Sequence, residues 1–291
     1  VYPCPSNSAN LTVTVNALPT AVISTTNPSI CNGNNTTIDF TLTGSAPFDV
    51  TYDDGSGNII HTFNNTNGSI VVSPSTNTTY TLVSVTDANG CFATVSSSVL
   101  ITVTPGANPG TNGSISVCED SSPFDLFPQL NGTPDIGGVW TESGNNVSNM
   151  FDPSTYTAGT YTLTYTIDLP PCIPVTADVI VTINPIVDAG SNGTHTVCEG
   201  EPTFNLFNYL TGSPDPGGNW TDVSSNPVSN MFDPSTSGSG AFVFTYTVLG
   251  TPPCIDATAT VTITVTPVPN AGVIGNIPVC EDSSPFDLFP Q

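Results

Sequence analysis

The chain has 291 residues and contains no Lys or Arg, while 23 Asp and Glu residues give it a formal net charge of −23. Because phosphates and anionic lipids are bound by clustered Lys and Arg, the composition excludes nucleic acid as a partner and argues against docking on an anionic membrane. The sequence also lacks a run of about 18 apolar residues, so it predicts no direct membrane insertion.

The residue types favour an all-β fold. Thr, Val, Ile, Leu and Tyr alternate over segments such as 159–168 (GTYTLTYTID) and 176–185 (TADVIVTINP). This alternation predicts strands with one buried apolar face and one solvated, hydroxyl-rich face. It also argues against disorder, which is the alternative for a polar, Pro-rich chain.

The sequence is built from internal repeats. The segment VCEDSSPFDLFPQ occurs at 117–129 and again at 279–291, and the stretches that begin at Val117 and Val197 share the motifs PDxGGxWT, VSNMFDPST and PPC. A more divergent copy precedes them. We therefore expect five parts, namely the tail of a preceding repeat at 1–17, whole repeats at 18–105, 106–185 and 186–267, and the head of a following repeat at 268–291. The chain is expected to be an excerpt of a longer array.

Each whole repeat is expected to be an immunoglobulin-like β-sandwich. In the second repeat the strand-like segments are 124–130, 137–143, 148–155, 159–168 and 176–185. Short strands at regular spacing, with a Cys–Trp–Cys order, are typical of that fold. Four aromatic residues are predicted to lie in the cores: Trp140, Trp220, Phe151 and Phe232. Because the linkers are short and contain Pro and Gly, the tandem domains are expected to form an extended rod.

Two cysteines occur in each whole repeat. The regular occurrence of two cysteines per repeat indicates disulfides and therefore an oxidising, extracellular location. The expected bonds close each repeat on itself: Cys31–Cys91, Cys118–Cys172 and Cys198–Cys254. Cys4 and Cys280 belong to the incomplete repeats, so their partners are expected outside this sequence. Zinc binding is the alternative, but the sequence has no C-x-x-C motif.

The sequence predicts that the protein is not an enzyme. Its two histidines, His61 and His195, stand at non-equivalent places in their repeats, and it has no H-E-x-x-H, phosphate-loop or G-x-S-x-G motif. The neighbouring carboxylates Glu119 and Asp120 could serve a glycosidase, but calcium binding or solubility explains them better.

Calcium is the one cofactor that the sequence leaves open. Two groups of oxygen-bearing side chains are the candidates: Asp53, Asp54 and Asn58 in the segment DDGSGN, and Asp188, Glu199 and Glu201 near the linkers. The first group resembles a loop of calcium ligands, but a turn between two strands explains it equally well. The second group would stiffen a junction between domains.

The motifs GGxWT, MFDPST, GTYTLTYT and ATVTITVTP, together with TTYTLVSVTDANGC, resemble the immunoglobulin-like and PKD-like repeats of giant cell-surface adhesins in Bacteroidota. Within that group the repeats are similar to those of SprB-like gliding-motility adhesins. The resemblance covers essentially the whole chain. It implies type IX secretion, display at the cell surface, and attachment to surfaces, polysaccharide or other cells.

The interpretation that follows is a structural and adhesive one. We expect a disulfide-stapled stalk in a long extracellular adhesin or filament, in which each repeat has its neighbours in the chain as partners. The absence of Lys and Arg also removes every cleavage site for trypsin-type proteases. Two alternatives remain open at this point, a glycan-binding β-sandwich module and a subunit of a surface polymer that exchanges strands.

Overall fold

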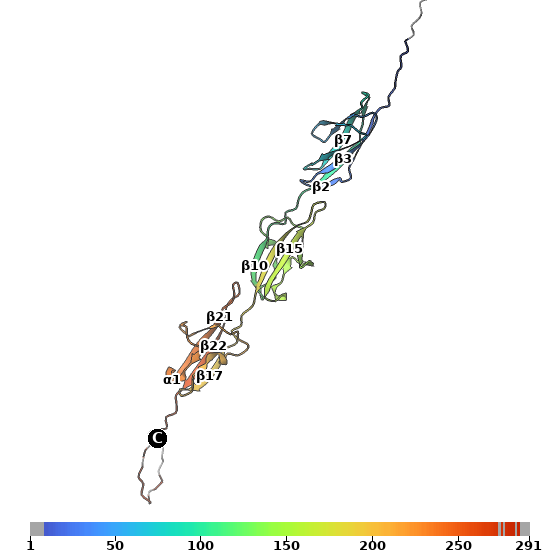
Figure 1. The fold of residues 1–291 in the computed structure, drawn as a ribbon. Helices are drawn as coiled ribbons and strands as arrows, with labels where there is room; N and C mark the ends of the chain where they lie inside the picture. The colour runs from blue at the N-terminus through green and yellow to red at the C-terminus, as the bar shows by residue number, and fades with distance from the viewer. Residues whose placement is uncertain (1–8, 273–274, 276, 283, 286–291) are drawn as a thin grey trace, which may run out of the picture. The chain divides into compact units, whose positions relative to one another are not determined.

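The protein is all-β in its computed structural model, which describes residues 9–272, 275, 277–282 and 284–285. Figure 1 shows strands throughout, and the only α-helix among the described residues is the four-residue α1 (Pro234–Ser237). No described helix is both long and apolar enough to cross a membrane. Residues 9–19 form no strand, although LTVTV alternates, because no neighbouring strand of the described chain pairs with them.

The first repeat is a sandwich of two sheets. One sheet has the order β1 (Thr20–Ser24), β3 (Thr36–Thr43), β6 (Asn67–Val72). The other has the order β2 (Ser29–Cys31), β9 (Ser98–Thr104), β7 (Thr78–Thr86), β4 (Phe48–Asp53), β5 (Asn58–Phe63), with β8 (Phe92–Thr94) also paired to β7. The pair β2–β9 is parallel and the other pairs are antiparallel. The adjacent strands β9, β7 and β4 thus occupy the G, F and C positions of an immunoglobulin sandwich.

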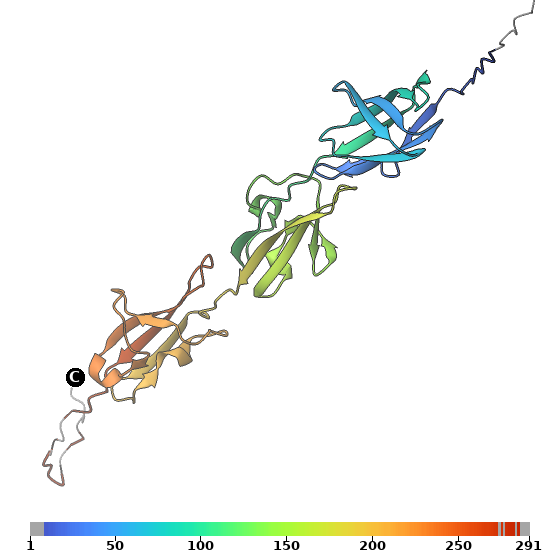
Figure 2. The same cartoon turned by 45° about the horizontal axis from the view of Figure 1, so that its top comes forward.

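The second and third repeats have a larger sheet like that of the first repeat, but the strands of their other sheet are shorter. The larger sheet of the second repeat has the order β10 (Gly113–Cys118), β16 (Val175–Asn184), β15 (Gly159–Ile167), β12 (Val139–Glu142), β13 (Asn145–Val147). That of the third has the order β17 (Gly193–Cys198), β22 (Ala257–Thr266), β21 (Gly240–Val248), β19 (Asn219–Thr221), which Figure 2 shows in yellow to red.

The smaller sheets of these repeats contain only two-residue strands. They are the pairs β11 (Phe124–Asp125) with β14 (Met150–Phe151), and β18 (Phe204–Asn205) with β20 (Met231–Phe232). Single turns of 3-10 helix, η1 (Phe127–Gln129), η2 (Pro153–Thr155) and η3 (Leu206–Tyr209), complete these layers. The segment predicted as one strand at 124–130 is therefore a short strand followed by a helical turn, because Pro128 cannot donate a ladder hydrogen bond.

The predicted core aromatics are buried. Trp140 is 4% exposed and its ring lies 5.1 Å from that of Tyr165, while Trp220 and Tyr246 repeat this contact at 5.0 Å. Phe151 and Phe232 are buried as well. The four core predictions are confirmed, and they rule out an exposed platform built from these aromatic rings.

The PDxGG motif fixes the entrance to the C-position strand of each later repeat. The hydroxyl of Tyr165 donates to the carbonyl of Asp135 at 2.9 Å and accepts from the backbone N–H of Gly138 at 2.8 Å. A Cβ atom at Gly138 would lie 2.6 Å from both the carbonyl oxygen of Thr166 and the ring of Tyr165, so glycine is required there. Tyr246 makes the same two bonds in the third repeat, to Asp215 and Gly218.

The chain divides into two compact units. The first comprises residues 1–115, 123–152 and 160–182, and the second comprises 116–122, 153–159 and 183–291. The boundary passes through the second repeat, whose Cys118 end belongs to the second unit. The strands nevertheless lie within the residue limits expected for the three repeats. That each repeat is an independent domain stays a prediction.

Candidate functional site: the disulfide junction between repeats

The two disulfides found among the described residues join neighbouring repeats. Cys31 is bonded to Cys172, with Cα atoms 4.9 Å apart, and Cys118 is bonded to Cys254, with Cα atoms 5.4 Å apart. Each bond lies within one of the two compact units. The expected bonds inside single repeats are therefore wrong: Cys31–Cys91, Cys118–Cys172 and Cys198–Cys254.

The reason is the distance between the two cysteines of one repeat. Cys118 ends β10, and the next residue, Glu119, donates its backbone N–H to the carbonyl of Asn184 at the end of β16. Cys172 lies just before the start of β16, which is ten residues long. At about 3.3 Å per residue the strand holds the two cysteines roughly 30 Å apart, whereas a disulfide needs Cα atoms within about 7 Å.

The first cysteine of every repeat, which we call the early cysteine, has one backbone setting. Cys31, Cys118 and Cys198 each end a strand that lies beside the last strand of the repeat, and Cys31 and Cys198 are in parallel register with Thr104 and Thr266. In all three repeats the residue after the early cysteine donates its N–H to the carbonyl of the last strand's final residue, at 2.9–3.1 Å. The early cysteine is thus fixed beside the carboxyl end of the repeat's last strand.

The second cysteine of each repeat, which we call the late cysteine, lies in a tight loop. This loop joins the last two strands in the second and third repeats, and it joins β7 to β8 in the first repeat. In the second and third repeats this loop is Leu-Pro-Pro-Cys or Thr-Pro-Pro-Cys, and the cysteine N–H donates to the carbonyl three residues earlier at 2.9 Å. The sulfur of Cys172 lies 3.7 Å from the carbonyl oxygen of Thr104, and the sulfur of Cys254 lies 3.7 Å from that of Asn184. The late cysteine therefore rests on the end of the preceding repeat's last strand.

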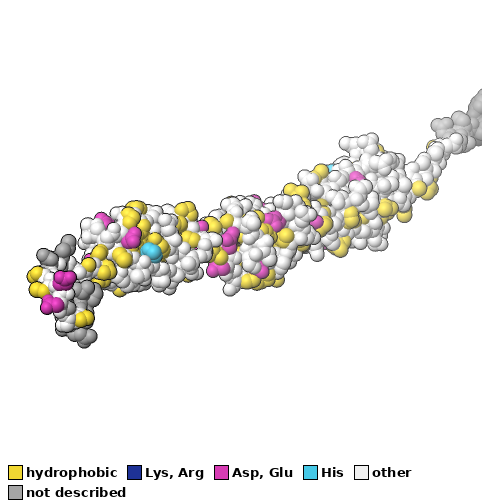
Figure 3. Space-filling view, turned by 90° about the horizontal axis from the view of Figure 1, so that it is seen from below, with side chains coloured by type: hydrophobic (Ala, Val, Ile, Leu, Met, Phe, Trp, Pro, Cys, Tyr) yellow, Lys and Arg dark blue, Asp and Glu magenta, His cyan; other side chains and the backbone are white. Residues whose placement is uncertain are grey.

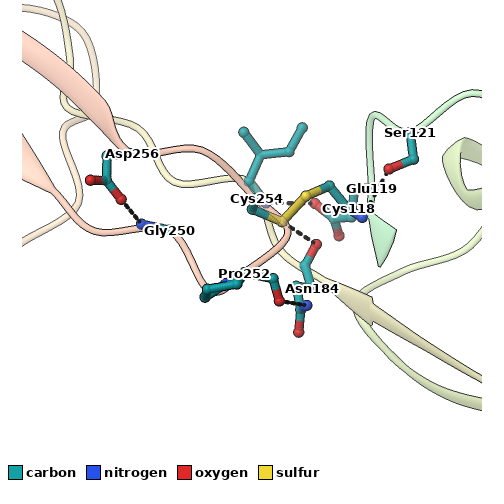
Figure 4. Close-up of a disulfide and its surroundings, with 9 residues drawn as sticks. Cys118, Glu119, Ser121, Asn184, Gly250, Pro252, Cys254 and Asp256 are labelled. Atoms are coloured by element: carbon teal, nitrogen blue, oxygen red, sulfur yellow. Dashed lines mark hydrogen bonds between the residues drawn. A yellow bond between two sulfur atoms is a disulfide. The ribbon is translucent and has the colours of Figure 1, made fainter. Parts of the chain in front are cut away.

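The junction at Cys118 carries further polar contacts, which Figure 4 shows around the disulfide. The side-chain amide of Asn184 donates to the carbonyl of Pro252 at 3.1 Å. The carboxylate of Glu119 accepts from the backbone N–H of Ala158 at 3.0 Å and of Ile186 at 3.4 Å. Glu119, which the sequence left between catalysis, calcium and solubility, thus binds the backbone on both sides of the junction.

The linkers are tied to the repeats that follow them. Asp188 donates its N–H to the carboxylate of Asp215 at 2.8 Å, and Asp215 returns its own N–H to the carbonyl of Asp188 at 2.7 Å. Asn108 and Asp135 make the same reciprocal pair at 2.8 Å in the second repeat. The recurring Asp of PDxGG thus fixes a linker residue 27 positions earlier, which the motif alone does not indicate.

The late loop of the first repeat is organised by Asp87 instead of prolines. This side chain is 6% exposed and accepts from the backbone N–H groups of Ser45, Asn89 and Cys91 at 3.0–3.2 Å. Burial favours the neutral carboxyl, but the hydrogen bonds outweigh it and hold the pKa of Asp87 below its ordinary value. Sequence reasoning missed Asp87, although its place before Asn89 and Gly90 is a turn signal.

The candidate calcium ligands have structural roles in the described chain. The carboxylate of Asp53 accepts from the N–H groups of Gly55 and Gly57, and that of Asp54 accepts from the hydroxyl and N–H of Ser56, which lowers the pKa of Asp54. Asn58 starts β5 opposite Asp53. Within the described residues, no three His, Cys, Asp or Glu side chains gather as a metal site.

The second group of calcium candidates takes part in backbone turns. Asp188 accepts from the N–H of Gly190 at 2.7 Å, and the N–H groups of Glu199 and Glu201 donate to Thr266 and Cys198. Calcium binding at either group, which the sequence left open, stays an untested alternative.

The face of the molecule that Figure 3 shows is mostly uncharged, with acidic side chains in scattered spots. One groove recurs on the second and third repeats, with volumes of about 520 and 410 Å³. It lies against the equivalent ring pairs Trp140–Tyr165 and Trp220–Tyr246. Amides such as Asn149 and Asn230 border it.

No known protein family and no curated protein matches the chain. Among solved structures, the I-band fragment I67-I69 from titin is 14% identical, with 86% of this chain and 99% of that chain covered and a TM-score of 0.49. A Ca²⁺-stabilized adhesin, described as helping an Antarctic bacterium reach out and bind ice, is 16% identical, with coverage of 89% and 77% and a TM-score of 0.36. The four N-terminal Ig domains of Dscam1 isoform 9.44 are 13% identical, with coverage of 85% and 73% and a TM-score of 0.33.

Proposed function

We propose that this chain is a stalk segment that carries mechanical tension in a long extracellular adhesin or filament at the cell surface. The observation that supports the proposal is the pair of disulfides that join one repeat to the next. Domains joined by a single linker move relative to one another by default. A second covalent tie between neighbours restricts that motion and limits how far the chain extends when a repeat unfolds.

The chemistry of the chain suits this role. Disulfides persist in oxidising compartments, in agreement with export from the cell. A chain without Lys or Arg offers trypsin-type proteases no cleavage site, which favours a long life outside the cell. The resemblance to adhesin repeats extends the proposal to type IX secretion, gliding motility, and attachment to surfaces, polysaccharide or other cells.

The stapling has a mechanical consequence that can be calculated. Along the backbone, Cys31 and Cys254 are 223 residues apart (254 − 31). With both disulfides intact, a shorter covalent path crosses the first bond to Cys172, follows the backbone back to Cys118 and crosses the second bond to Cys254. This path contains only the 54 residues from Cys118 to Cys172 (172 − 118). At roughly 3.4 Å per residue, full extension gives about 76 nm for the reduced chain and about 18 nm for the oxidised chain. The oxidised stalk therefore stays short under forces that unfold its repeats.

Single-molecule stretching between the two ends of the chain tests the proposal. We expect the oxidised protein to show the shorter extension and the reduced protein to show the longer one. The double variant Cys31→Ser, Cys118→Ser is the control, because it removes both bonds without a reducing agent and should match the reduced protein. An oxidised chain that extends as far as this control would refute the proposed mechanical role.

A second candidate function, glycan binding, is favoured by the groove that recurs beside Trp140 and Trp220. A glycan array probed with the full chain tests it. Binding that is lost in the double variant Asn149→Ala, Asn230→Ala would support the glycan-binding module, and an array without signal would refute it. The other alternative, exchange of strands between subunits, has no comparable observation in its favour.

A further inference from the structure

The carboxyl end of the third repeat has the setting of the first two junctions, but its early cysteine forms no disulfide with a described residue. Cys198 is exposed and stands opposite Thr266 in the parallel pair of β17 and β22. The N–H of Glu199 donates to the carbonyl of Thr266 at 3.0 Å, as Glu119 does to Asn184 at the bonded junction. The backbone half of a junction is therefore already formed at Cys198.

The space that a late loop would enter is open in this repeat. A hollow of about 380 Å³ lies beside Cys198 and is lined by Glu201, Pro202 and Thr266 among others. The hydroxyl of Thr266 donates to the carbonyl of Val197 at 3.2 Å and lies 3.6 Å from the Cys198 sulfur. In the bonded junctions, the carbonyl that corresponds to that of Thr266 is the one on which the late cysteine rests.

The two bonded junctions indicate where the missing half comes from. In both, the late cysteine belongs to the repeat that follows next in the chain. After Thr266 the sequence begins another repeat, because residues 279–291 are identical to residues 117–129. The late loop of that repeat would lie beside Cys198 in the same way that the loop of Cys172 lies beside Cys31.

We propose that Cys198 is the acceptor half of a third inter-repeat disulfide, formed with the late cysteine of the repeat that begins after Thr266. The reaction joins two thiols, which lose two electrons and two protons. The oxidant is a disulfide compound such as oxidised glutathione or a disulfide oxidoreductase, which is reduced to two thiols through a mixed-disulfide intermediate. The disulfide junction then recurs along the chain, and each repeat is covalently bonded to the next repeat.

Cys91 is the complementary half. It is the late cysteine of the first repeat, it forms no disulfide with a described residue, and Asp87 holds its loop in place. In both bonded junctions, the late cysteine pairs with the early cysteine of the repeat before it. The proposal does not depend on whether the chain adheres to anything, so it can fail or hold independently of the stalk function.

Extension of the chain tests the proposal. A copy of residues 130–184 added after Gln291 completes a fourth repeat, because residues 279–291 already supply its head. After oxidation with a glutathione couple, we expect mass spectrometry to find Cys198 joined to the added copy of Cys172. Maleimide labelling of Cys198 should fall from complete in the original chain to background in the extended one. The same extended chain with Ser at the added copy of Cys172 is the control, and it should label fully.

Two results would overturn the proposal. One is a bond between the added copy of Cys172 and Cys280, which would close the fourth repeat on itself. The other is full labelling of Cys198 in the oxidised extended chain. If the fourth repeat does not fold, a peptide of residues 169–175 with an activated mixed disulfide at its cysteine gives a second test. Transfer to Cys198 faster than to Cys91 supports the proposal, and equal or slower transfer contradicts it.

Discussion

Cys31 and Cys172 are 141 positions apart in the sequence, and their sulfur atoms are bonded across two successive repeats. Cys118 and Cys254 repeat the relationship one step along the chain, so the two disulfide loops overlap. Cutting either bond leaves the other in place. Both bonds must be cut before the second repeat is held to its two neighbours by the linkers alone. The overlap gives each cysteine variant a distinct expected outcome.

The substitution Cys172→Ser should release the thiol of Cys31 and leave Cys118 bonded. Closing a loop of 141 residues stabilises the folded state by about 5 kcal/mol in the chain-entropy model, so the variant should also unfold at a lower temperature. Thiol labelling in denaturant without reductant, followed by calorimetry, measures both effects. Release of Cys118 in place of Cys31 would contradict the pairing.

The hydroxyls of Tyr165 and Tyr246 should each contribute to stability. Replacing either tyrosine by Phe leaves a backbone N–H and a carbonyl of the PDxGG turn without their bond, which costs about 1–3 kcal/mol. Urea unfolding monitored by tryptophan fluorescence measures the change, because Trp140 and Trp220 lie against these rings. A change within the error of the measurement would show that water replaces the lost hydroxyl.

Gly138→Ala provides a steric counterpart to the tyrosine variants. The added methyl group would lie 2.6 Å from a backbone carbonyl oxygen, so the second repeat must distort and should lose stability. Gly106→Ala is the matched control, since no atom lies within 4 Å of the methyl position there. Equal unfolding midpoints in urea for these two variants would contradict the close approach.

The first repeat should lose stability in acid through Asp87. Because hydrogen bonds hold the folded-state pKa of this carboxyl below its ordinary value of about 3.9, its contribution is fully present above that value. The contribution is lost as the pH falls through the lower, folded-state pKa. Thermal unfolding between pH 2 and 7 measures it, and Asp87→Asn should weaken the pH dependence; an unchanged profile in this variant would assign the acid sensitivity elsewhere.

Removal of calcium should leave the unfolding temperature unchanged. The carboxylates of Asp53, Asp54 and Asp188 already accept hydrogen bonds from turn N–H groups, and the described residues form no cluster that would hold a metal. Calorimetry with and without a chelator checks the expectation. A drop in unfolding temperature that added Ca²⁺ restores would establish the calcium junction that the sequence left open.

The alternation of residues such as those in 159–168 was enough to predict the strands, and the burial of Trp140 followed from its place in a sandwich repeat. The cysteine pairing could not be predicted from counting, because bonds within repeats and bonds shifted by one repeat use the same two cysteines per repeat. The usable signal was the ten-residue strand between Cys172 and the end of the sheet. Its length alone separates the two cysteines of one repeat too far for a bond.

The contacts of Glu119, Asn184 and Asp87 were beyond the reach of the sequence for a different reason. Each side chain binds the backbone of a segment distant in the chain, such as Ala158 or Pro252. Local patterns in the sequence report strands and turns, but they carry no information on which turns meet at a junction.

The most direct test of the account is a disulfide map of the unreduced protein. Digestion with pepsin at low pH suits it, because the chain has no tryptic sites and acid suppresses the thiolate that would exchange disulfides. We expect mass spectrometry to find fragments that join Cys31 to Cys172 and Cys118 to Cys254. Fragments that join Cys31 to Cys91, or Cys118 to Cys172, would contradict the stapling of one repeat to the next.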